Sequence, residues 1–415
     1  MIHNKSRTYA ELMDQRDSLN GYRNLFNYPK NNTGDPLIYF CGNSLGLQPK
    51  AAFSQIKKEF SIWSNKGVLG QDSRWIPYHE RMTKTSAKLV GAKETEVVVM
   101  NALTVNIHLL LISFYQPSKK RHKVIMEKDA FPSDQYAIKS QIELHGYDPK
   151  NSIIEISPRD KEKIIREKDI ISSIIENRDE LALIYIGGVN YYTGQVFNME
   201  KISKVAKENN IIIGFNLAHA AGNIPLSLHD WEVDFSSWCT YKYLCGGPGS
   251  PAGIFIHENH HDWKGPRLTG WWGHNKKSRF EMPSSFDPIP TSEAWQISNA
   301  PIMGMAPLIV AMDMFDKVGM DKIREKSIQL TSYLQYLIEC FLPSVKIITP
   351  DSRGCQLSII VPNGRKIFNF LNQNDVVCDW RNPDVIRVAP HPLFNTYVEV
   401  YEFIQIMKKA IEQET

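Results

Sequence analysis

Lys242 is the residue whose surroundings most favour chemistry in this chain. It follows the apolar stretch Val233–Trp238 and precedes the flexible loop Gly246–Gly249. A lysine just beyond a buried strand lies in a partly desolvated place, which disfavours the ammonium ion and leaves the amine available for a Schiff base. Most lysines at strand ends are instead surface residues that reach into solvent. The neighbouring residues decide between these two interpretations.

A second apolar run supplies polar groups that complement this lysine. Ile211–Phe215 ends at Asn216, and His219 follows. A lysine that holds an aldehyde and a hydrogen-bonding side chain that faces a ring nitrogen together suit a pyridoxal phosphate site. Tyr241 could donate to a phosphate or to a developing oxyanion, although a half-buried tyrosine with a solvated hydroxyl is the ordinary alternative. We therefore expect a pyridoxal phosphate enzyme.

Two more strand ends offer groups for the phosphate and the ring of such a cofactor. Asn101–Asn106 follows an apolar run and opens a helix expected over Ile107–Tyr115. The free N–H groups at its start suit an anion, and Thr104 adds a hydroxyl. Phe131 could stack on a flat heterocycle, and Asp134 could accept a hydrogen bond at the cofactor. Taken alone, these features are equally typical of a helix cap and of a proline-containing turn.

Other candidates lie further along the chain. Trp271 and Asn299 occur in an irregular region, where exposed tryptophan and asparagine residues often come from a partner subunit to close a ligand pocket. Arg387 lies at the end of an expected strand and could hold a substrate carboxylate in a two-bond fork. The ordinary alternatives are interface packing and a surface ion pair. His257, His260 and His261 lack any zinc-binding spacing, so we expect no metal.

Composition limits the possible partners and compartments. The chain of 415 residues has 48 basic and 45 acidic residues and a formal net charge of +3, which does not argue for nucleic acid. The N-terminus is too polar for a signal peptide, and the densest apolar run, Leu109–Tyr115, is too short to cross a bilayer. Six scattered cysteines with no Cys-x-x-Cys pair are typical of reduced thiols. We expect a cytoplasmic protein without a membrane partner.

The elements that must position these residues follow an alternating pattern. Short β-branched runs separated by longer amphipathic stretches predict an α/β fold, with a mainly parallel seven-stranded sheet between helices. The expected strands are Val97–Met100, Lys123–Met126, Ile153–Ile156, Leu183–Ile186, Ile211–Phe215, Val233–Phe235 and Ala252–Ile256, and Met199–Asn209 is an expected helix.

The pattern changes near residue 265. Residues 265–300 are rich in Gly, Pro, Trp and Ser and predict a long functional loop region. Helical periodicity over Met305–Phe341 and a tail of short strands and one helix predict a smaller α+β domain. We expect residues 1–60 to form an N-terminal segment and part of the small domain, 61–305 the large cofactor-binding domain, and 306–415 a connecting helix and the small C-terminal domain. The expected elements of the tail are strands at Gln356–Val361, Val376–Trp380 and Val385–Val388 and a helix from Thr396.

Several longer motifs resemble one family of fold type I pyridoxal phosphate enzymes, the kynureninases, and the resemblance covers nearly the whole chain. The matching segments are Tyr39–Pro49, Asn101–Asn106, Phe131–Ala137, Tyr192–Gln195, Ser237–Leu244, Gly270–His274, Arg353–Leu357, Val377–Arg381 and Ile386–Pro390. The resemblance implies hydrolysis of L-kynurenine or its 3-hydroxy form to an anthranilate and L-alanine, by a homodimer with its active sites at the subunit interface.

The resemblance also implies a role for each candidate. Lys242 would carry the cofactor and move protons, assisted by Tyr241, and Arg387 would bind the substrate's α-carboxylate. The residues implied to bind the cofactor are Leu103, Thr104, Phe131, Asp134, Gly187, Asn216, His219, Tyr241 and Lys242, with Trp271 and Asn299 from the partner subunit. The residues implied to face the substrate, besides Arg387, are Asn43, Ser44, Val68 and Ser298.

Several positions depart from the family pattern, including Ala300, which replaces a proline, and His391. Asn216 stands where the family has aspartate, Gly187 where the animal enzymes have serine, and Val68 where a histidine faces the substrate's aromatic ring. A carboxylate keeps the pyridine nitrogen protonated, whereas a neutral amide supplies no charge, at a cost of about 1.5–3 kcal/mol. The alternatives are therefore a family member that carries out a different amino-acid reaction in secondary metabolism, or a cofactor-binding scaffold that functions by interaction.

Overall fold

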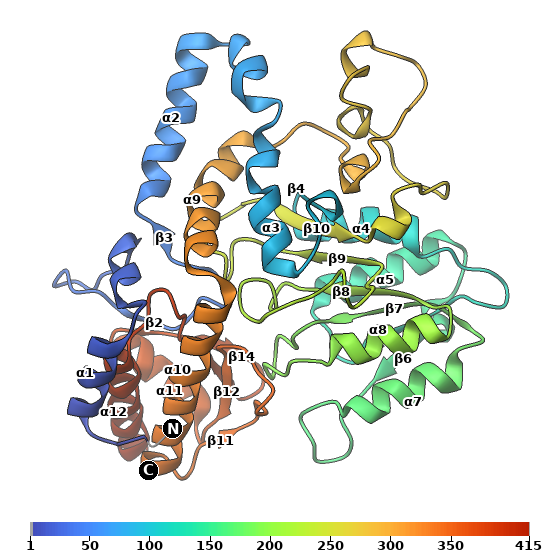
Figure 1. The fold of residues 1–415 in the computed structure, drawn as a ribbon. Coiled ribbons are helices and arrows are strands. Elements are labelled where there is room, and N and C mark those ends of the chain that lie inside the picture. Colours follow the sequence, from blue (N-terminus) through green and yellow to red (C-terminus); the bar gives the residue numbers. More distant parts are fainter. Residues whose placement is uncertain (1–2, 415) are drawn as a thin grey trace.

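The computed structural model describes residues 3–414, and its centre is a seven-stranded sheet (Figure 1). The strand order is β4-β10-β9-β8-β7-β5-β6, and only β10 runs antiparallel to its neighbours. The predicted α/β class and mainly parallel sheet are therefore confirmed. The strands are β4 (Val97–Met100), β5 (Lys123–Glu127), β6 (Ile153–Ile156), β7 (Leu181–Gly187), β8 (Ile212–Asn216), β9 (Phe235–Trp238) and β10 (Ala252–Ile256).

Helices cover both faces of this sheet because successive strand residues point to opposite sides. In β4, Val98 packs in one apolar cluster with α4 and α5, whereas Val97 and Val99 pack in another with α7 and α8. Both faces are apolar, so the strands read as continuous hydrophobic runs. The helices of this part are α2 (Ala51–Lys66), α3 (Thr83–Val90), α4 (Leu103–Phe114), α5 (Pro132–Leu144), α6 (Pro149–Ser152), α7 (Glu167–Asn177) and α8 (Met199–Glu208).

A four-stranded antiparallel sheet of order β11-β12-β15-β14 organises the C-terminal part of the chain. Its strands are β11 (Lys346–Ile347), β12 (Leu357–Ile360), β14 (Asp379–Arg381) and β15 (Val385–Val388), and its helices are α10 (Met320–Phe341), α11 (Gly364–Gln373) and α12 (Tyr397–Glu414). The N-terminal strand β2 (Ile38–Tyr39) pairs in parallel with β13 (Val376–Val377), and β1 (Phe26–Asn27) pairs with β3 (Gln48–Pro49). The first residues of the chain thus complete a unit made mostly by the last ones. The domain boundaries proposed near residues 60 and 305 remain predictions.

Four expected elements differ in detail, and the first is the strand expected at Val233–Phe235, which is β9 at Phe235–Trp238. The long helical stretch is two helices, α9 (Ile302–Val318) and α10, because Gly319 between them has a φ of 79°, which breaks a helix. The expected strand Val376–Trp380 divides between two sheets. The helix expected from Ile107 begins already at Leu103, so its first turn lies closer to the strand than its apolar pattern suggests.

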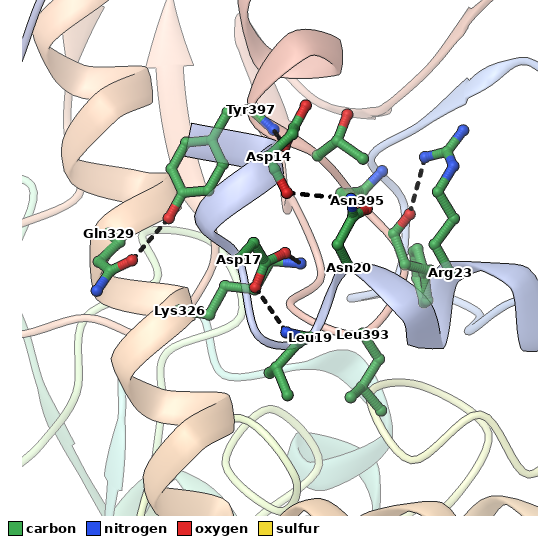
Figure 2. A network of polar contacts seen from close by, with 12 residues as sticks. Asp14, Asp17, Leu19, Asn20, Arg23, Lys326, Gln329, Leu393, Asn395 and Tyr397 are labelled. Atoms are coloured by element: carbon green, nitrogen blue, oxygen red, sulfur yellow. Dashed lines mark hydrogen bonds and ion pairs between the residues drawn. The ribbon is translucent and has the colours of Figure 1, made fainter. Parts of the chain in front are cut away.

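The N-terminal helix α1 (Arg7–Arg16) is joined to the C-terminal part by a polar network (Figure 2). The Asp14 carboxylate accepts hydrogen bonds from the backbone N–H groups of Tyr397 (2.7 Å) and Val398 (3.1 Å) at the start of α12. Lys326 on α10 forms an ion pair of 2.6 Å with Asp17, and both side chains are only 5% exposed. The two bonds from Asp14 give acceptors to backbone N–H groups that have no partner within the first turn of α12.

The region predicted to be irregular contains only short turns of helix. Between residues 265 and 300 these are 3-10 turns at Trp271–Gly273, Arg279–Glu281 and Ser292–Trp295. Comparable short turns occur earlier at Asn20–Leu25, Gln71–Trp75, Tyr78–Met82, Glu94–Glu96 and Glu258–His260. Among residues 3–414, no helix combines the length and the apolar character needed to cross a bilayer.

Candidate active site

One cavity lies where the carboxyl ends of β4, β5, β7 and β8 meet. Parallel strands place their carboxyl ends at the same edge of a sheet, which is where ligands of open α/β sheets bind. Nine residues predicted to bind the cofactor line this cavity: Leu103, Thr104, Phe131, Asp134, Gly187, Asn216, His219, Tyr241 and Lys242. Ala102, Glu127, Ser133, Val189, Tyr191 and Ala218 complete its wall.

Lys242 reaches the cavity from a turn that follows β9. The turn is held by Gly46, whose N–H donates to the carbonyl of Tyr241 (2.8 Å), and by Gly246, whose N–H donates to that of Thr240 (2.9 Å). The lysine Nζ lies 3.0 Å from His219 Nε2. Burial, with the positive charge of Arg387 as a lesser cause, lowers the pKa of Lys242 and favours the neutral amine.

His219 is a neutral partner for this lysine. Burial, and next the charge of Lys242, hold the pKa of His219 well below its usual value. A neutral imidazole can accept a hydrogen bond from the lysine at Nε2, while Nδ1 lies 3.5 Å from the Tyr243 hydroxyl. Lys242 thus contacts an uncharged acceptor, and no ion pair joins it to a carboxylate in the described part of the chain.

Asn216 and Asp134 form a hydrogen-bonded pair in the cavity wall. The Asn216 Nδ2 donates to both carboxylate oxygens of Asp134, at 2.9 and 2.8 Å, and its Oδ1 accepts from the N–H of Ala218 at 2.9 Å. Burial raises the pKa of Asp134 to about 6, and the donation from Asn216 partly opposes that rise. The carboxylate that the family has at position 216 is therefore absent, but a carboxyl group directly adjoins the amide.

Glu127 is a cavity residue that the sequence analysis missed. It is the last residue of β5, and its Oε2 accepts from Asn190 Nδ2 at 3.3 Å. Burial, with a smaller contribution from the nearby Asp134, raises its pKa to about 7. A Cβ atom at Gly187 would lie 2.9 Å from Glu127 Oε1, so a serine there would require this carboxyl group to move. The signal was a glutamate directly after an expected strand.

The start of α4 offers a place for a phosphate. Ala102, the residue before the helix, provides no side-chain hydrogen bond to the first turn. The N–H groups of that turn therefore lack the usual side-chain acceptor and carry the positive end of the helix dipole. Thr104 and Tyr241 line the same cavity with their hydroxyl-bearing side chains. Burial raises the pKa of Tyr241 to about 12, so its hydroxyl stays protonated and can donate.

An aromatic wall faces this cavity. Phe131 is 43% exposed, although it is a large apolar residue in the interior of a cleft. Its ring meets that of Tyr191 edge to face at 5.5 Å, and the Lys242 Nζ lies 5.8 Å from its centroid. An apolar ring left uncovered beside a reactive amine suits a flat aromatic ligand.

Arg387 lies behind this wall and is only 1% exposed. Its Nη1 donates to the carbonyl of Tyr191 at 2.6 Å, and Nε and Nη2 contact the carboxylate of Asp379. Asn43 is buried and donates to Gln356 Oε1 at 2.9 Å, and the N–H of Ser44 bonds to the carbonyl of Cys41. None of these three predicted substrate residues lines the cofactor cavity, and Arg387 reaches its wall through the contact with Tyr191.

Val68, Trp271 and Asn299 lie together in a different hollow. Val68 and Trp271 are exposed, and the Ser298 hydroxyl donates to Asn299 Oδ1 at 3.1 Å. Within a single chain these four residues therefore do not reach the Lys242 cavity. Their proposed roles at the active site require a second copy of the chain.

A second polar cluster involves one of the histidines considered above. Ligand atoms of Glu96, His229 and His257 lie within 4.8 Å of one another. Glu96 Oε1 contacts His229 Nδ1 at 2.9 Å and accepts from the N–H of Glu258, and the two imidazole rings stack at 5.0 Å. Hydrogen bonding and stacking hold this arrangement together, and the expectation that no metal binds stays a prediction.

The fold and the cavity define a class of protein, fold type I pyridoxal phosphate enzymes. A cysteine desulfurase from Thermococcus onnurineus matches with a TM-score of 0.76 and 17% identity, covering 91% of this chain and 95% of that structure. A variant of the enzyme C-DES with glycine covalently linked to its pyridoxal phosphate matches with a TM-score of 0.76 and 16% identity, covering 89% and 96%. These structures establish the shared fold.

Relatives of known family place the chain more closely. It is 48% identical to a kynureninase of Flavobacterium psychrophilum over 99% of both chains, and 43% identical to one of Nematostella vectensis over 98% of this chain and 94% of that one. Residues 323–407 match the kynureninase C-terminal domain. The chain belongs to the kynureninase family, as the resemblance of its motifs predicted.

The cofactor is pyridoxal 5′-phosphate, and the cavity fits it. A first helical turn without a side-chain cap suits the phosphate, the uncovered ring of Phe131 suits the pyridine face, and Lys242 offers an amine of lowered pKa. Asn216 and Asp134 present an amide and a carboxyl group side by side for the edge of the ring. The role of each residue toward the cofactor remains a proposal.

Proposed function

We propose that this protein hydrolyses L-kynurenine, or a ring-modified kynurenine such as the 3-hydroxy form, to the corresponding anthranilate and L-alanine. The observation that carries the proposal is the 48% identity over 99% of the chain to a protein named kynureninase. The reaction consumes one water and breaks the bond between Cβ and the side-chain carbonyl carbon. Its products would place the protein in tryptophan catabolism, towards NAD biosynthesis, in the cytoplasm.

We assign separate roles in this reaction to Lys242, Tyr241 and Arg387. Bound pyridoxal phosphate supplies an electron sink for the α-carbon of an amino acid. The Lys242 amine would hold the cofactor at its aldehyde carbon and, once free, would accept the substrate's α-proton. Tyr241 donates its hydroxyl proton to a phosphate or to a developing oxyanion. Arg387 binds the α-carboxylate and orients the α-carbon towards the lysine.

Asn216 would donate a hydrogen bond to the cofactor's ring edge without supplying charge. The Asn216 amide also binds Asp134, so the carboxyl group next to it is that of Asp134. The family pattern instead has a carboxylate at position 216 itself. This difference predicts slower turnover rather than a different reaction. The full-length similarity to kynureninases disfavours the alternative of a different amino-acid reaction, and a scaffold would not need the amine of lowered pKa at Lys242.

A homodimer would complete the site. The exposed aromatic residues Phe53, Phe60 and Trp63 lie on α2, which projects from the molecule at the top of Figure 1. An apolar surface of this kind is typical of a protein–protein interface. A second copy seated there would bring Trp271 and Asn299 to the partner's cavity, with Val68 and Ser298 beside the substrate's ring.

The test is to load the purified protein with pyridoxal phosphate and add L-kynurenine or 3-hydroxykynurenine. We expect the fluorescence of an anthranilate to appear together with L-alanine in equal amounts. Sedimentation velocity on the same sample should show a dimer. A loaded protein whose cofactor absorbance responds to amino acids, but which releases no anthranilate from either substrate, would contradict the proposed reaction.

A further inference from the structure

We propose that Asp379 is a positioning residue for the substrate's carboxylate: it holds the Arg387 guanidinium so that one end of it stays open for a second carboxylate. The inference rests on the proposed function, in which Arg387 binds the α-carboxylate. Asp379, on β14, would thus affect which substrates bind without contacting the substrate itself.

The hydrogen bonds of Arg387 show which part of the guanidinium is held. Asp379 binds the side of the guanidinium that carries Nε and Nη2: its Oδ1 lies 3.3 Å from Nε and its Oδ2 lies 2.5 Å from Nη2. The carbonyl of Tyr191 accepts from Nη1 at 2.6 Å. A guanidinium has five N–H groups, and these contacts use one on each nitrogen. One N–H on each terminal nitrogen is not used by these contacts, and a bidentate carboxylate needs two donors.

The sheet makes this arrangement rigid. Asp379 on β14 and Arg387 on β15 are direct register partners across the antiparallel pair. Neighbouring side chains of such a pair extend from the same face. Both side chains are nearly buried, at 8% and 1% exposure. Asp379 therefore cannot withdraw to solvent when a substrate arrives, and it acts as a fixed support rather than as a displaceable occupant.

Charge balance points to the same role. Arg381 also contacts Asp379, with its Nη2 3.1 Å from Oδ2, and its buried Nε has no hydrogen-bond partner among the described residues. Two arginines thus share one carboxylate and leave a single positive charge next to the cavity. That charge is felt there, because both arginines lower the pKa of Lys242 and of His219. One incoming carboxylate would neutralise it.

A structural salt bridge would look similar, so the test must separate support of the fold from selection of a carboxylate. We would measure the dissociation constants of L-alanine and of L-alaninamide on the holoenzyme, from the change in the visible absorbance of the bound cofactor. The two probes differ only in the carboxylate. The variants are Asp379→Asn and Asp379→Glu, with Asp375→Asn as the control, because Asp375 is an exposed aspartate of the same region whose Oδ2 accepts from Asn31 at 2.9 Å.

For Asp379→Asn we expect L-alanine to bind roughly 10-fold to 100-fold more weakly, the range for losing a hydrogen bond to a charged group. L-Alaninamide should bind as in the wild type, and KM for kynurenine should rise with little change in kcat. Asp379→Glu keeps the charge but displaces the guanidinium, so it should also lose preference for the carboxylate. This second variant decides the matter if Asp379→Asn fails to fold.

An unchanged ratio of the two dissociation constants in the folded variants would overturn the inference, even if their stability fell. A wild-type protein without preference for L-alanine would overturn it as well. These outcomes are independent of kynurenine cleavage: a wild type that prefers L-alanine but releases no anthranilate would contradict the proposed reaction and leave the positioning role supported.

Discussion

Lys242 and Lys326 are both shielded from solvent, but the charged groups around them differ. Lys326 on α10 is paired with Asp17 at 2.6 Å, and Asp14 and Glu399 add negative charge nearby. Lys242 contacts the neutral His219 at 3.0 Å; after burial, Arg387 and Arg381 lower its pKa, and Cys239 and Asp134 oppose them without forming an ion pair. Burial lowers the pKa of both lysines, but only the Lys326 network, drawn in Figure 2, supplies an adjacent counter-charge.

The difference separates a structural lysine from a reactive one. A carboxylate partner stabilises the ammonium ion and withdraws the nitrogen lone pair from chemistry, whereas a neutral acceptor among positive charges leaves the amine available. The carboxyl groups of the active-site cavity, on Asp134 and Glu127, form no ion pair with Lys242 and are bound by Asn216 and Asn190 instead.

Lys242→Ala tests the reactive member of the comparison and should have the largest effect. We expect kynurenine turnover to fall by more than about 10³-fold, because the variant loses both the attachment of the cofactor and the group that moves the α-proton. The fold should persist, since Lys242 forms no ion pair. Anthranilate fluorescence and far-ultraviolet circular dichroism measure the two properties, and turnover at the wild-type rate would refute the assignment.

Lys326→Met tests the structural member. It leaves Asp17 buried without its counter-charge, which typically costs about 3–5 kcal/mol. The urea midpoint of unfolding should fall, while turnover per folded molecule stays unchanged. Lys88→Met is the matched control, because Lys88 pairs with Asp316 at an exposed site, where such pairs contribute about 0–1 kcal/mol. Equal losses in both variants would argue against a special role for the buried pair.

Glu127→Gln tests whether the cavity tolerates negative charge. The folded protein holds the Glu127 proton up to about pH 7, whereas the ordinary pKa is 4.5. The folded state therefore binds more protons than the unfolded state between these values, and this contribution to stability is complete below pH 4.5 and is lost as pH rises through 7. When the pH rises from 5 to 8, the free energy of unfolding should fall by about 2–3 kcal/mol less in the Glu127→Gln variant than in the wild type.

Urea unfolding at several pH values measures that difference. Glu155→Gln is the control, because Glu155 is exposed on the neighbouring strand β6, and its pH dependence should match that of the wild type. A glutamine variant with the full wild-type slope would show that Glu127 is ionised in the folded protein at neutral pH.

Asn216→Asp would make the cavity more like the Lys326 network by adding a carboxylate. Without cofactor, the new group would meet the Asp134 oxygens at the 2.8–2.9 Å now spanned by the amide, so one of the two must keep a proton. We expect a loss of about 1–3 kcal/mol in stability at pH 8, and less at pH 5. With cofactor bound, turnover should rise about tenfold or more, from the charge supplied to the pyridine nitrogen.

The exchanged pair, Asn216→Asp with Asp134→Asn, keeps a single carboxylate and serves as the control for stability. Kynurenine turnover and urea unfolding at the two pH values measure the effects. If Asn216→Asp left turnover unchanged, Asp134 would already supply the charge that the ring requires.

Much of the cofactor cavity was predictable because its residues follow parallel strands, whose carboxyl ends must meet. Asn216, Gly187 and Asp134 come together for that reason. The support of Arg387 by Asp379 was not predictable, because it depends on the register of two short antiparallel strands. The pairing of Lys326 with Asp17 joins distant parts of the chain, and hydrophobic periodicity contains no information about such partners. Gly319 broke a helix whose apolar pattern continued through it.

The pairing of β2 with β13, and the contacts from Asp14 to the start of α12, set an order of assembly during synthesis. Residues 3–50 are translated long before their partners, since 383 residues separate Asp14 from Tyr397. The helix α1 cannot make its contacts with α12 until α12 has been translated. A fragment that began at α10 would expose the apolar surface that Ala10, Ile38 and Phe40 cover. Nascent chains of this protein would therefore depend on protection from aggregation until β13 and α12 have been translated.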